Sequence, residues 1–275
     1  MREDEVATLV GIAAEAAELV FRIYQTPFEV DYKGPRDPVT LADRAANELI
    51  CKRLETAFPG VPVVAEESAP EAFTGYQSAE RIFFVDPVDG TREFVAKNGE
   101  FVVMIGVVEG DRATASVIHA PATGIAWVGL EGHGAFRLSP GEGKTKIHVS
   151  DCAELSRVRA VVSRSHRTAT VERAVNELGA GSILQQGSAG LKGARVAEAS
   201  ADAYVAPFHA GQRWDVCACD ALVHAAGGRV TDAYGAPIAY RAPTLAQDTG
   251  VVVSNGLVHD ALLERLASFR ARSGH

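Results

Sequence analysis

The chain has 275 residues, of which 47% are hydrophobic and 23% are charged, a composition typical of a folded globular protein rather than a disordered one. Its formal net charge of −8 disfavours an extended surface for nucleic-acid polymers, because such surfaces need clustered positive charge. The sequence has no apolar run of membrane-spanning length and no secretory signal pattern at its N-terminus, so we expect a cytoplasmic protein without membrane contact.

The first half of the sequence predicts helices packed on an antiparallel sheet. Apolar residues recur at helical spacing from Val6 to Ile23, and a second helix is predicted after Thr40. Short apolar segments then alternate with Gly, Pro or Asp, a pattern typical of an antiparallel sheet with tight turns. The predicted strands of this sheet cover residues 101–108, 113–119, 124–130 and 134–138.

The second half predicts an α/β unit, in which strand-like and helix-like segments alternate. Because the chain exceeds the usual size for one core, we expect two subdomains. The polar, turn-rich segment at residues 139–146 is the predicted boundary, which gives subdomains at residues 1–145 and 146–275. The predicted helices cover residues 169–178, a segment from Asp215 and residues 257–269, and the predicted strands cover residues 160–162, 203–205, 229–231 and 251–253.

The four cysteines are few and irregularly spaced, which favours neither a disulfide framework nor a zinc site. Cys217 and Cys219 lie two residues apart, and on a helix such residues point in different directions. We therefore expect both to be small packing residues.

The most informative stretch is residues 86–91, which read Asp-Pro-Val-Asp-Gly-Thr after an apolar run at residues 82–85. This pattern predicts a strand-to-helix corner that carries two carboxylates. Carboxylate oxygens are the ligands that Mg²⁺ prefers, and the N-terminus of a short helix opened by Gly90 suits a phosphate. The alternative interpretation is an ordinary turn, since Asp, Pro and Gly are common in turns.

Three further segments place acids at the ends of predicted elements. Glu66 and Glu67 end a predicted buried strand, Asp215 opens a helix, and Asp43 follows Thr40 in the first turn of the second helix. Each also has a structural interpretation, namely a surface Glu pair, a helix N-terminal acid and a capping box. Four acidic element ends in one chain are nevertheless what a two-metal oxygen site needs.

In this order and spacing, the segments resemble the lithium-sensitive, Mg²⁺-dependent phosphatase superfamily of the inositol monophosphatases and fructose-1,6-bisphosphatases, over most of the chain. Residues 92–94 read Arg-Glu-Phe and residues 98–101 read Asn-Gly-Glu-Phe, which is similar to the CysQ-type 3'(2'),5'-bisphosphate nucleotidases. Inositol monophosphatases usually read Thr-Asn-Phe after the Gly. The resemblance implies an α/β protein with an α+β first half, the layered αβαβα sugar-phosphatase fold, and a homodimer.

The resemblance also implies a metal centre in which Asp86 bridges two Mg²⁺ ions. Glu66 and the Val88 carbonyl would complete the first site, and Asp89 with Asp215 the second. A third, weaker ion would be supported through water by Glu67. Mn²⁺ would substitute for Mg²⁺, and Li⁺ would inhibit.

Catalytic and substrate-binding residues are implied in the same way. Thr91 would orient the nucleophilic water, Asp43 would hold Thr91, and the N–H groups of Gly90 and Thr91 would bind phosphate. Residues 163–166 and 187–192 resemble substrate-contacting segments of the nucleotidases. The implied sets are Thr91, Asp43 and Glu66 for catalysis, and Asp89, Gly90, Thr91, Ser188 and Lys192 for substrate, with a solvated surface lysine as the alternative for Lys192.

Residues 203–214 contain no Asp or Glu, whereas inositol monophosphatases carry an acid there that binds inositol hydroxyls. We therefore expect a 3'(2'),5'-bisphosphate nucleotidase of sulfur metabolism that hydrolyses adenosine 3',5'-bisphosphate to AMP, or dephosphorylates its sulfated precursor. Residues 209–213 and 216–220 differ from the nucleotidase pattern, which leaves adenine recognition open. The alternatives are an inositol-1-phosphate or broad sugar-phosphate phosphatase, and a non-catalytic metal-dependent binding protein, which the pair Thr91 and Asp43 disfavours.

Overall fold

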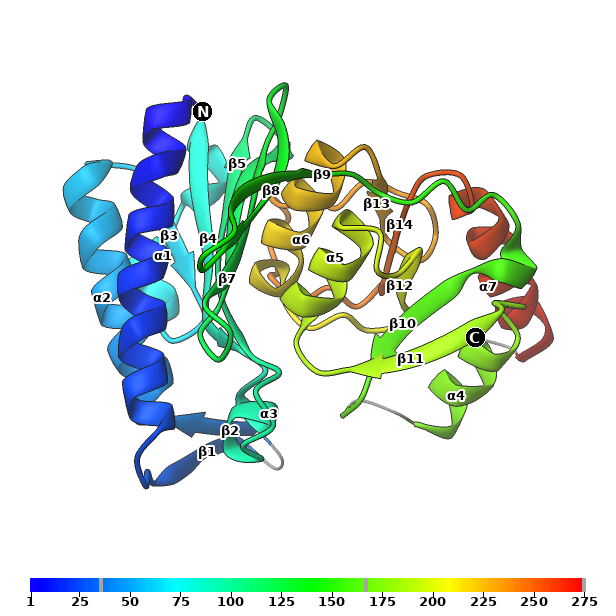
Figure 1. Ribbon diagram of the computed structural model, residues 1–275, viewed down its shortest axis with the longest axis horizontal. Helices are drawn as coiled ribbons and strands as arrows, with labels where there is room; N and C mark the ends of the chain where they lie inside the picture. Colours follow the sequence, from blue (N-terminus) through cyan, green and yellow to red (C-terminus); the bar gives the residue numbers. More distant parts are fainter. Residues whose placement is uncertain (35–36, 166–167, 274–275) are drawn as a thin grey trace.

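The computed structural model describes residues 1–34, 37–165 and 168–273 of the chain. Its helices and sheets form alternating layers, with helices on the outside and a helical layer between two sheets (Figure 1). This arrangement confirms the predicted layered α/β fold. None of the helices among the described residues combines the length and apolar composition needed to cross a bilayer.

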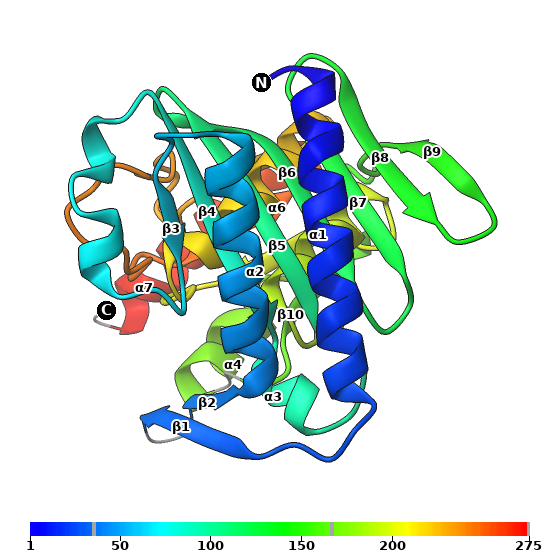
Figure 2. The ribbon, with the colours of Figure 1, turned by 90° about the vertical axis from the view of Figure 1, so that its left-hand side faces the viewer.

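The first layer consists of α1 (Glu3–Tyr24) and α2 (Leu41–Ala57), which pack side by side on one face of the first sheet (Figure 2). Between them, β1 (Val30–Gly34) and β2 (Asp37–Thr40) form an antiparallel hairpin that the sequence pattern did not predict. Its first strand carries mainly exposed side chains, so it lacks the apolar alternation by which a strand is recognised.

The first sheet has seven strands in the order β3-β4-β5-β6-β7-β8-β9, and all neighbours are antiparallel except β3 and β4. The four strands predicted between residues 101 and 138 correspond to β5 through β8. The segment at residues 139–146, predicted as a polar boundary, instead contains the turn into β9 and most of that strand. The bounds are β3 Val63–Ala65, β4 Arg81–Asp89, β5 Val102–Glu109, β6 Arg112–Ala120, β7 Ile125–Leu130, β8 Gly134–Ser139 and β9 Gly143–Ile147.

The second sheet has five strands in the order β11-β10-β12-β14-β13. β10 runs parallel to β11 and β12, whereas β14 runs antiparallel to β12 and β13. Its outer face is covered by α4 (Ala169–Asn176) and α7 (His259–Ser273) (Figure 1). The strands are β10 Arg159–Ser163, β11 Ser182–Gln186, β12 Ala203–Ala206, β13 Arg229–Thr231 and β14 Val251–Ser254, and the 3-10 helices are η1 Pro70–Phe73, η2 Tyr76–Ser78 and η3 Leu155–Arg157.

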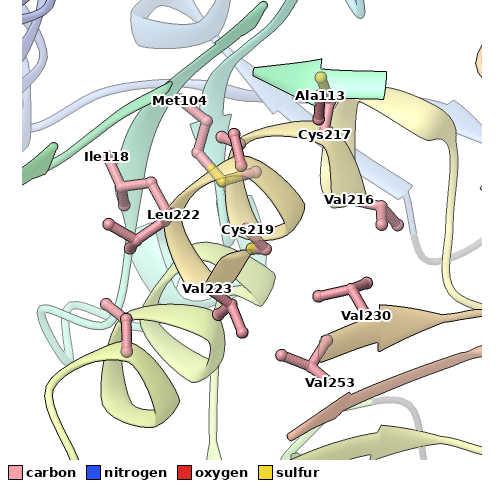
Figure 3. Packing of buried hydrophobic residues seen from close by; sticks show 14 of the residues in the cluster. Met104, Ala113, Ile118, Val216, Cys217, Cys219, Leu222, Val223, Val230 and Val253 are labelled. Carbon is pink, nitrogen blue, oxygen red and sulfur yellow. The ribbon is translucent and has the colours of Figure 1, made fainter. Parts of the chain in front are cut away.

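The middle layer is formed by α5 (Ala189–Ala197) and α6 (Arg213–Ala225), which lie between the two sheets. Helix α6 approaches the first sheet closely at Gly106, where an added Cβ would lie 2.6 Å from the Cys217 Sγ atom. Figure 3 shows Cys217, Cys219 and Leu222 of α6 within this core. Both cysteines are buried and free, which confirms the packing interpretation.

A fully buried histidine, His259, begins α7 with 0% of its surface exposed. Its Nδ1 atom lies 2.8 Å from Ser254 Oγ, and its Nε2 atom lies 2.9 Å from Thr231 Oγ1. Burial lowers the pKa of His259 from 6.5 to about 4, so the folded protein resists a proton that the unfolded chain accepts. The imidazole is therefore neutral in the folded protein at neutral pH.

We expect the free energy of unfolding to decrease by about 2–3 kcal/mol as the pH falls from about 6.5 to about 4. The decrease arises because the unfolded chain binds a proton at His259 in this range, whereas the folded protein does not. Urea unfolding of the wild type and of His259→Gln at several pH values in this window measures the loss. The variant should be less stable at pH 7 but should depend less on pH, because both proteins share all other titrating groups. Identical pH slopes for the two proteins would contradict the prediction.

Candidate active site

Three of the predicted metal ligands converge where the first sheet meets α6. Asp86 and Asp89 lie at the end of β4, and Asp215 lies in the first turn of α6. One ligand oxygen from each of these carboxylates lies within 4.8 Å of the other two. Glu66 follows β3, the parallel neighbour of β4, and lines the same pocket. Residues distant in sequence therefore form one acidic cluster, as the sequence predicted.

The geometry of the corner comes from an irregularity in β4. Its pairing with β5 shifts between Asp86 and Asp89, and the Val88 N–H group donates to Asp86 Oδ1 at 3.0 Å. Such a bulge redirects side chains at a sheet edge. Gly90 then adopts a φ of +98°, and an added Cβ would lie 2.7 Å from the Glu100 carbonyl oxygen. Only glycine fits this position, after which α3 (Thr91–Val95) begins.

The electrostatics of the cluster favour a bound cation. Burial, reinforced by Glu66 and Asp89, raises the pKa of both Asp86 and Asp215 well above the usual range. Burial also raises the pKa of Glu66 to about 7. Buried carboxylates this close together are costly unless their charge is compensated, and an all-oxygen donor set is the kind that divalent hard cations prefer. The residues present therefore fit a divalent metal ion.

Glu66 and Glu67 share a contact with Lys33 of the β1–β2 hairpin. The Lys33 Nζ atom lies 3.0 Å from Glu66 Oε1 and also contacts Glu67 Oε1. This ammonium group partly compensates the negative charge on that side of the cluster. Support of a third metal ion by Glu67 stays a prediction.

Thr91 and Asp43 are in direct contact. The Thr91 hydroxyl donates to Asp43 Oδ1 at 3.0 Å, with the Val88 carbonyl oxygen as a second acceptor at 3.1 Å. Asp43 Oδ2 accepts from both the N–H and the hydroxyl group of Thr40, which completes the capping box of α2. Capping of α2 and the contact with Thr91 are therefore not alternative roles for Asp43, because one carboxylate makes both. With its hydrogen directed at acceptors, the Thr91 oxygen keeps lone pairs that can accept from a water.

Ser188 and Lys192 lie at the first turn of α5, where Ser188 contacts Asp89 of the acidic cluster. The Ser188 hydroxyl and the Gly190 N–H group both donate to Asp89 Oδ2, at 2.5 Å and 2.7 Å. Lys192 is only 4% exposed, and its Nζ atom donates to the Ser188 carbonyl at 2.6 Å. The alternative of a solvated surface lysine was therefore wrong. These contacts orient a predicted metal ligand, a role that the sequence analysis did not foresee for Ser188.

A second set of contacts joins the segment after β4 to the strands of the second sheet. Glu100 accepts from Arg164 and, at 2.7 Å, from the Gly187 N–H group. Glu93 is buried and accepts from the Ser165 hydroxyl. From the sequence, Glu93 and Glu100 were recognised only as part of a family signature, without these contacts. Of the segment 163–166 that it singled out, His166 lies outside the described residues.

The acidic cluster opens into a cavity of about 380 Å³ between the two sheets. Its wall includes residues of β12 and of the segment before α6, where Tyr204, Phe208, His209 and Trp214 line the space. Because residues 203–214 contain no acid, this wall presents no carboxylate before Asp215. The cavity thus combines an acidic floor with a wall of aromatic and imidazole side chains.

The sequence matches the inositol monophosphatase family over residues 2–273. The chain belongs to this family. It is 35% identical over 231 residues to the 3'(2'),5'-bisphosphate nucleotidase CysQ of Escherichia coli strain K12, a match that covers 83% of this chain and 91% of the relative. These findings confirm that the protein is a phosphatase, in preference to a non-catalytic binding protein.

Solved structures of the family have the same fold. A CysQ structure from Bacteroides thetaiotaomicron superposes with a TM-score of 0.78 at 28% identity, covering 92% of this chain and 97% of the other. The Thermotoga maritima IMPase superposes with a TM-score of 0.82 at 27% identity, covering 98% and 99%. The fold is therefore shared by relatives of both types, and fold alone does not distinguish their substrates.

Proposed function

We propose that the protein is a Mg²⁺-dependent 3'(2'),5'-bisphosphate nucleotidase that hydrolyses adenosine 3',5'-bisphosphate to AMP and phosphate. The observation that carries this proposal is the cavity wall from Tyr204 to Trp214, which has aromatic side chains and no carboxylate. Aromatic faces suit a nucleobase, whereas an acid in this wall would suit the hydroxyls of inositol. The similarity to CysQ supports the same assignment.

In this proposal, the acidic cluster would hold two metal ions, and Asp86 would serve both of them. Glu66 and the Val88 carbonyl would complete one site, and Asp89 and Asp215 would complete the other. Bound Mg²⁺ would lower the pKa of the attacking water and would compensate the negative charge on the leaving oxygen. A weaker third ion near Glu67, substitution by Mn²⁺ and inhibition by Li⁺ belong to the same proposal.

The remaining steps fall to groups of the chain itself. Thr91 accepts a hydrogen bond from the nucleophilic water, because Asp43 keeps the Thr91 hydrogen occupied. The N–H groups of Gly90 and Thr91 bind phosphate oxygens. Ser188 and Gly190 hold the carboxylate of Asp89 in place. Direct attack by water in line with the leaving group then needs no covalent phosphoenzyme. Assembly as a homodimer and a cytoplasmic location stay predictions.

The decisive experiment compares substrates by phosphate release at one pH and one Mg²⁺ concentration. We expect kcat/KM for adenosine 3',5'-bisphosphate to exceed that for inositol 1-phosphate by at least about tenfold, since one added charged contact in the transition state is worth about 1.4 kcal/mol. Excess chelator should abolish both activities, and added Mg²⁺ should restore them. A preference for inositol 1-phosphate would contradict the nucleotidase proposal and support the second candidate, an inositol-phosphate phosphatase, which the Thermotoga likeness favours.

Lys192 gives a more specific test of how the second phosphate is recognised. Lys192 lines the cavity, and its buried Nζ atom donates to the Ser188 carbonyl oxygen. We expect Lys192→Met to lower kcat/KM for the bisphosphate by about tenfold more than for a nucleoside monophosphate, because only the bisphosphate carries the group that Lys192 would contact. An equal loss on both substrates would make Lys192 a general support of the Ser188 segment.

A further inference from the structure

A second cavity, of about 400 Å³, lies at the opposite end of α6 from the acidic cluster. Asp215 lies in the first turn of this 13-residue helix and His224 lies in its last turn. At 1.5 Å per residue, the helix separates these two residues by roughly 14 Å along its axis. The second cavity is bordered by the end of α6, by the turn between β7 and β8, and by residues of β6 and β9. Among the residues that the structure describes, none lines both cavities.

The second cavity concentrates positive and protonatable groups in a chain whose net charge is −8. The one acid in its lining, Glu131, is ion-paired with Arg112 at 3.0 Å. A further acid, Glu3, lies 3.6 Å from the His133 ring but does not line the cavity. Lys146 and three imidazoles therefore face this space beside an Arg–Glu ion pair, and cationic or protonatable groups around a concave space attract an anion. The basic and imidazole side chains of the lining are Arg112, His133, Lys146, His148 and His224.

A buried chain of hydrogen bonds orients one of these imidazoles. His224 Nδ1 lies 2.6 Å from Asp220 Oδ1, and the Tyr240 hydroxyl donates to Asp220 Oδ2 at 2.6 Å. Asp220 and Tyr240 are both buried, so the carboxylate is held from two sides. Because an ionised carboxylate only accepts, His224 Nδ1 carries a hydrogen and the Nε2 atom is left for a ligand. The hydrogen bond to Asp220 also raises the pKa of His224, which favours the imidazolium.

The residues that line the second cavity restrict the class of ligand that it can bind. Among the described residues, the only group of three His, Cys, Asp or Glu side chains close enough to hold a metal is Asp86, Asp89 and Asp215, so the imidazoles here are too far apart for a metal site. The other lining residues are alanines and glycines, which offer neither an aromatic face nor a deep apolar surface. The site therefore suits a compact anion better than a nucleobase or a hydrophobic ligand.

We propose that this cavity is an anion site that binds a small ligand carrying two or more phosphate or sulfate groups. Lys146 contacts the ligand as a mobile charge from the rim, Arg112 contacts it from its ion pair with Glu131, and His224 donates from a fixed position at the end of α6. This site is independent of the substrate proposed for the acidic cluster. A cavity of this size holds a compact polyanion together with part of its hydration shell.

Calorimetry with inorganic tripolyphosphate as the probe tests the proposal. The full chain is titrated in excess chelator, because the acidic cluster without metal repels a polyanion, and in about 150 mM salt, which screens diffuse surface charge. We expect one binding event per chain. Lys146→Gln, Arg112→Gln and His224→Gln should each weaken it by about threefold to tenfold. Imidazole NMR signals of His224 should shift on titration, whereas those of His209, in the first cavity, should not.

Lys144→Gln is the matched control for Lys146→Gln. Both lysines lie on β9, but Lys144 Nζ lies 3.9 Å from the centre of the Phe136 ring and does not line the cavity. The control removes the same charge and should leave the affinity within about twofold of the wild type. Absence of binding to the wild type, equal weakening by both lysine variants, or shifts at His209 in place of His224 would each overturn the proposal.

Discussion

Asp86→Asn should reduce kcat/KM by at least about 10³-fold at ordinary Mg²⁺ concentrations, because one substitution weakens both proposed metal sites. Asp86 is 2% exposed and lies beside Asp89, Asp215 and Glu66, a position that suits the proposed bridging role. An amide would offer one neutral oxygen where the two proposed metal ions would need a charged bridge. No other single ligand change is expected to cost as much.

Phosphate release measured over a wide range of Mg²⁺ concentrations tests this expectation, with thermal unfolding in chelator as the control for folding. The variant should be no less stable than the wild type without metal, because Asn can still accept from the Val88 N–H group and removes one charge from a crowded cluster. Asp151→Asn, at an exposed acid that lines neither cavity, should keep wild-type activity. Near-normal turnover of Asp86→Asn would show that the bridging assignment is wrong.

Thr91→Ala should lower kcat by about 10²-fold while Mg²⁺ affinity changes little, since it removes the group that orients the nucleophile. The hydroxyl donates toward Asp43 and the Val88 carbonyl, so its oxygen can still accept from a water in the cavity that Thr91 lines. Thr91→Ser retains the hydroxyl and should recover most of the activity. Comparison of the two variants separates the effect on kcat of losing the hydroxyl group from the effect of losing the methyl group.

Kinetics and Mg²⁺ calorimetry on the same preparations decide between positioning of water and binding of metal. We expect the loss in Thr91→Ala to lie in kcat, with the Mg²⁺ dissociation constant within about threefold of the wild type. If Mg²⁺ binding weakened as much as turnover, Thr91 would belong among the metal ligands instead.

Several elements could not be predicted from the sequence because contacts with neighbouring elements stabilise them more than their own residue pattern does. β9 has four exposed residues out of five and reads as a loop, yet β8 supplies its hydrogen-bond partners. Residues 187–190, at the start of α5, read Gly-Ser-Ala-Gly, and the helix is stabilised by packing against α6. An edge strand or a packed helix thus depends on tertiary contacts more than on its own pattern.

The sequence by itself determined the order of the acidic element ends, the apolar periodicity of α1, β4 and α6, and the family to which they point. These are local features, and local spacing is what sequence patterns encode. The resemblance also predicted the contact of Asp43 with Thr91, 48 residues away, but the tertiary structure alone decided that the same carboxylate caps α2 as well. It likewise decided that Ser188 contacts Asp89 across 99 residues and that Lys192 is buried. Contacts between residues so far apart depend on how two sheets and the helices between them pack, and no single segment contains that information.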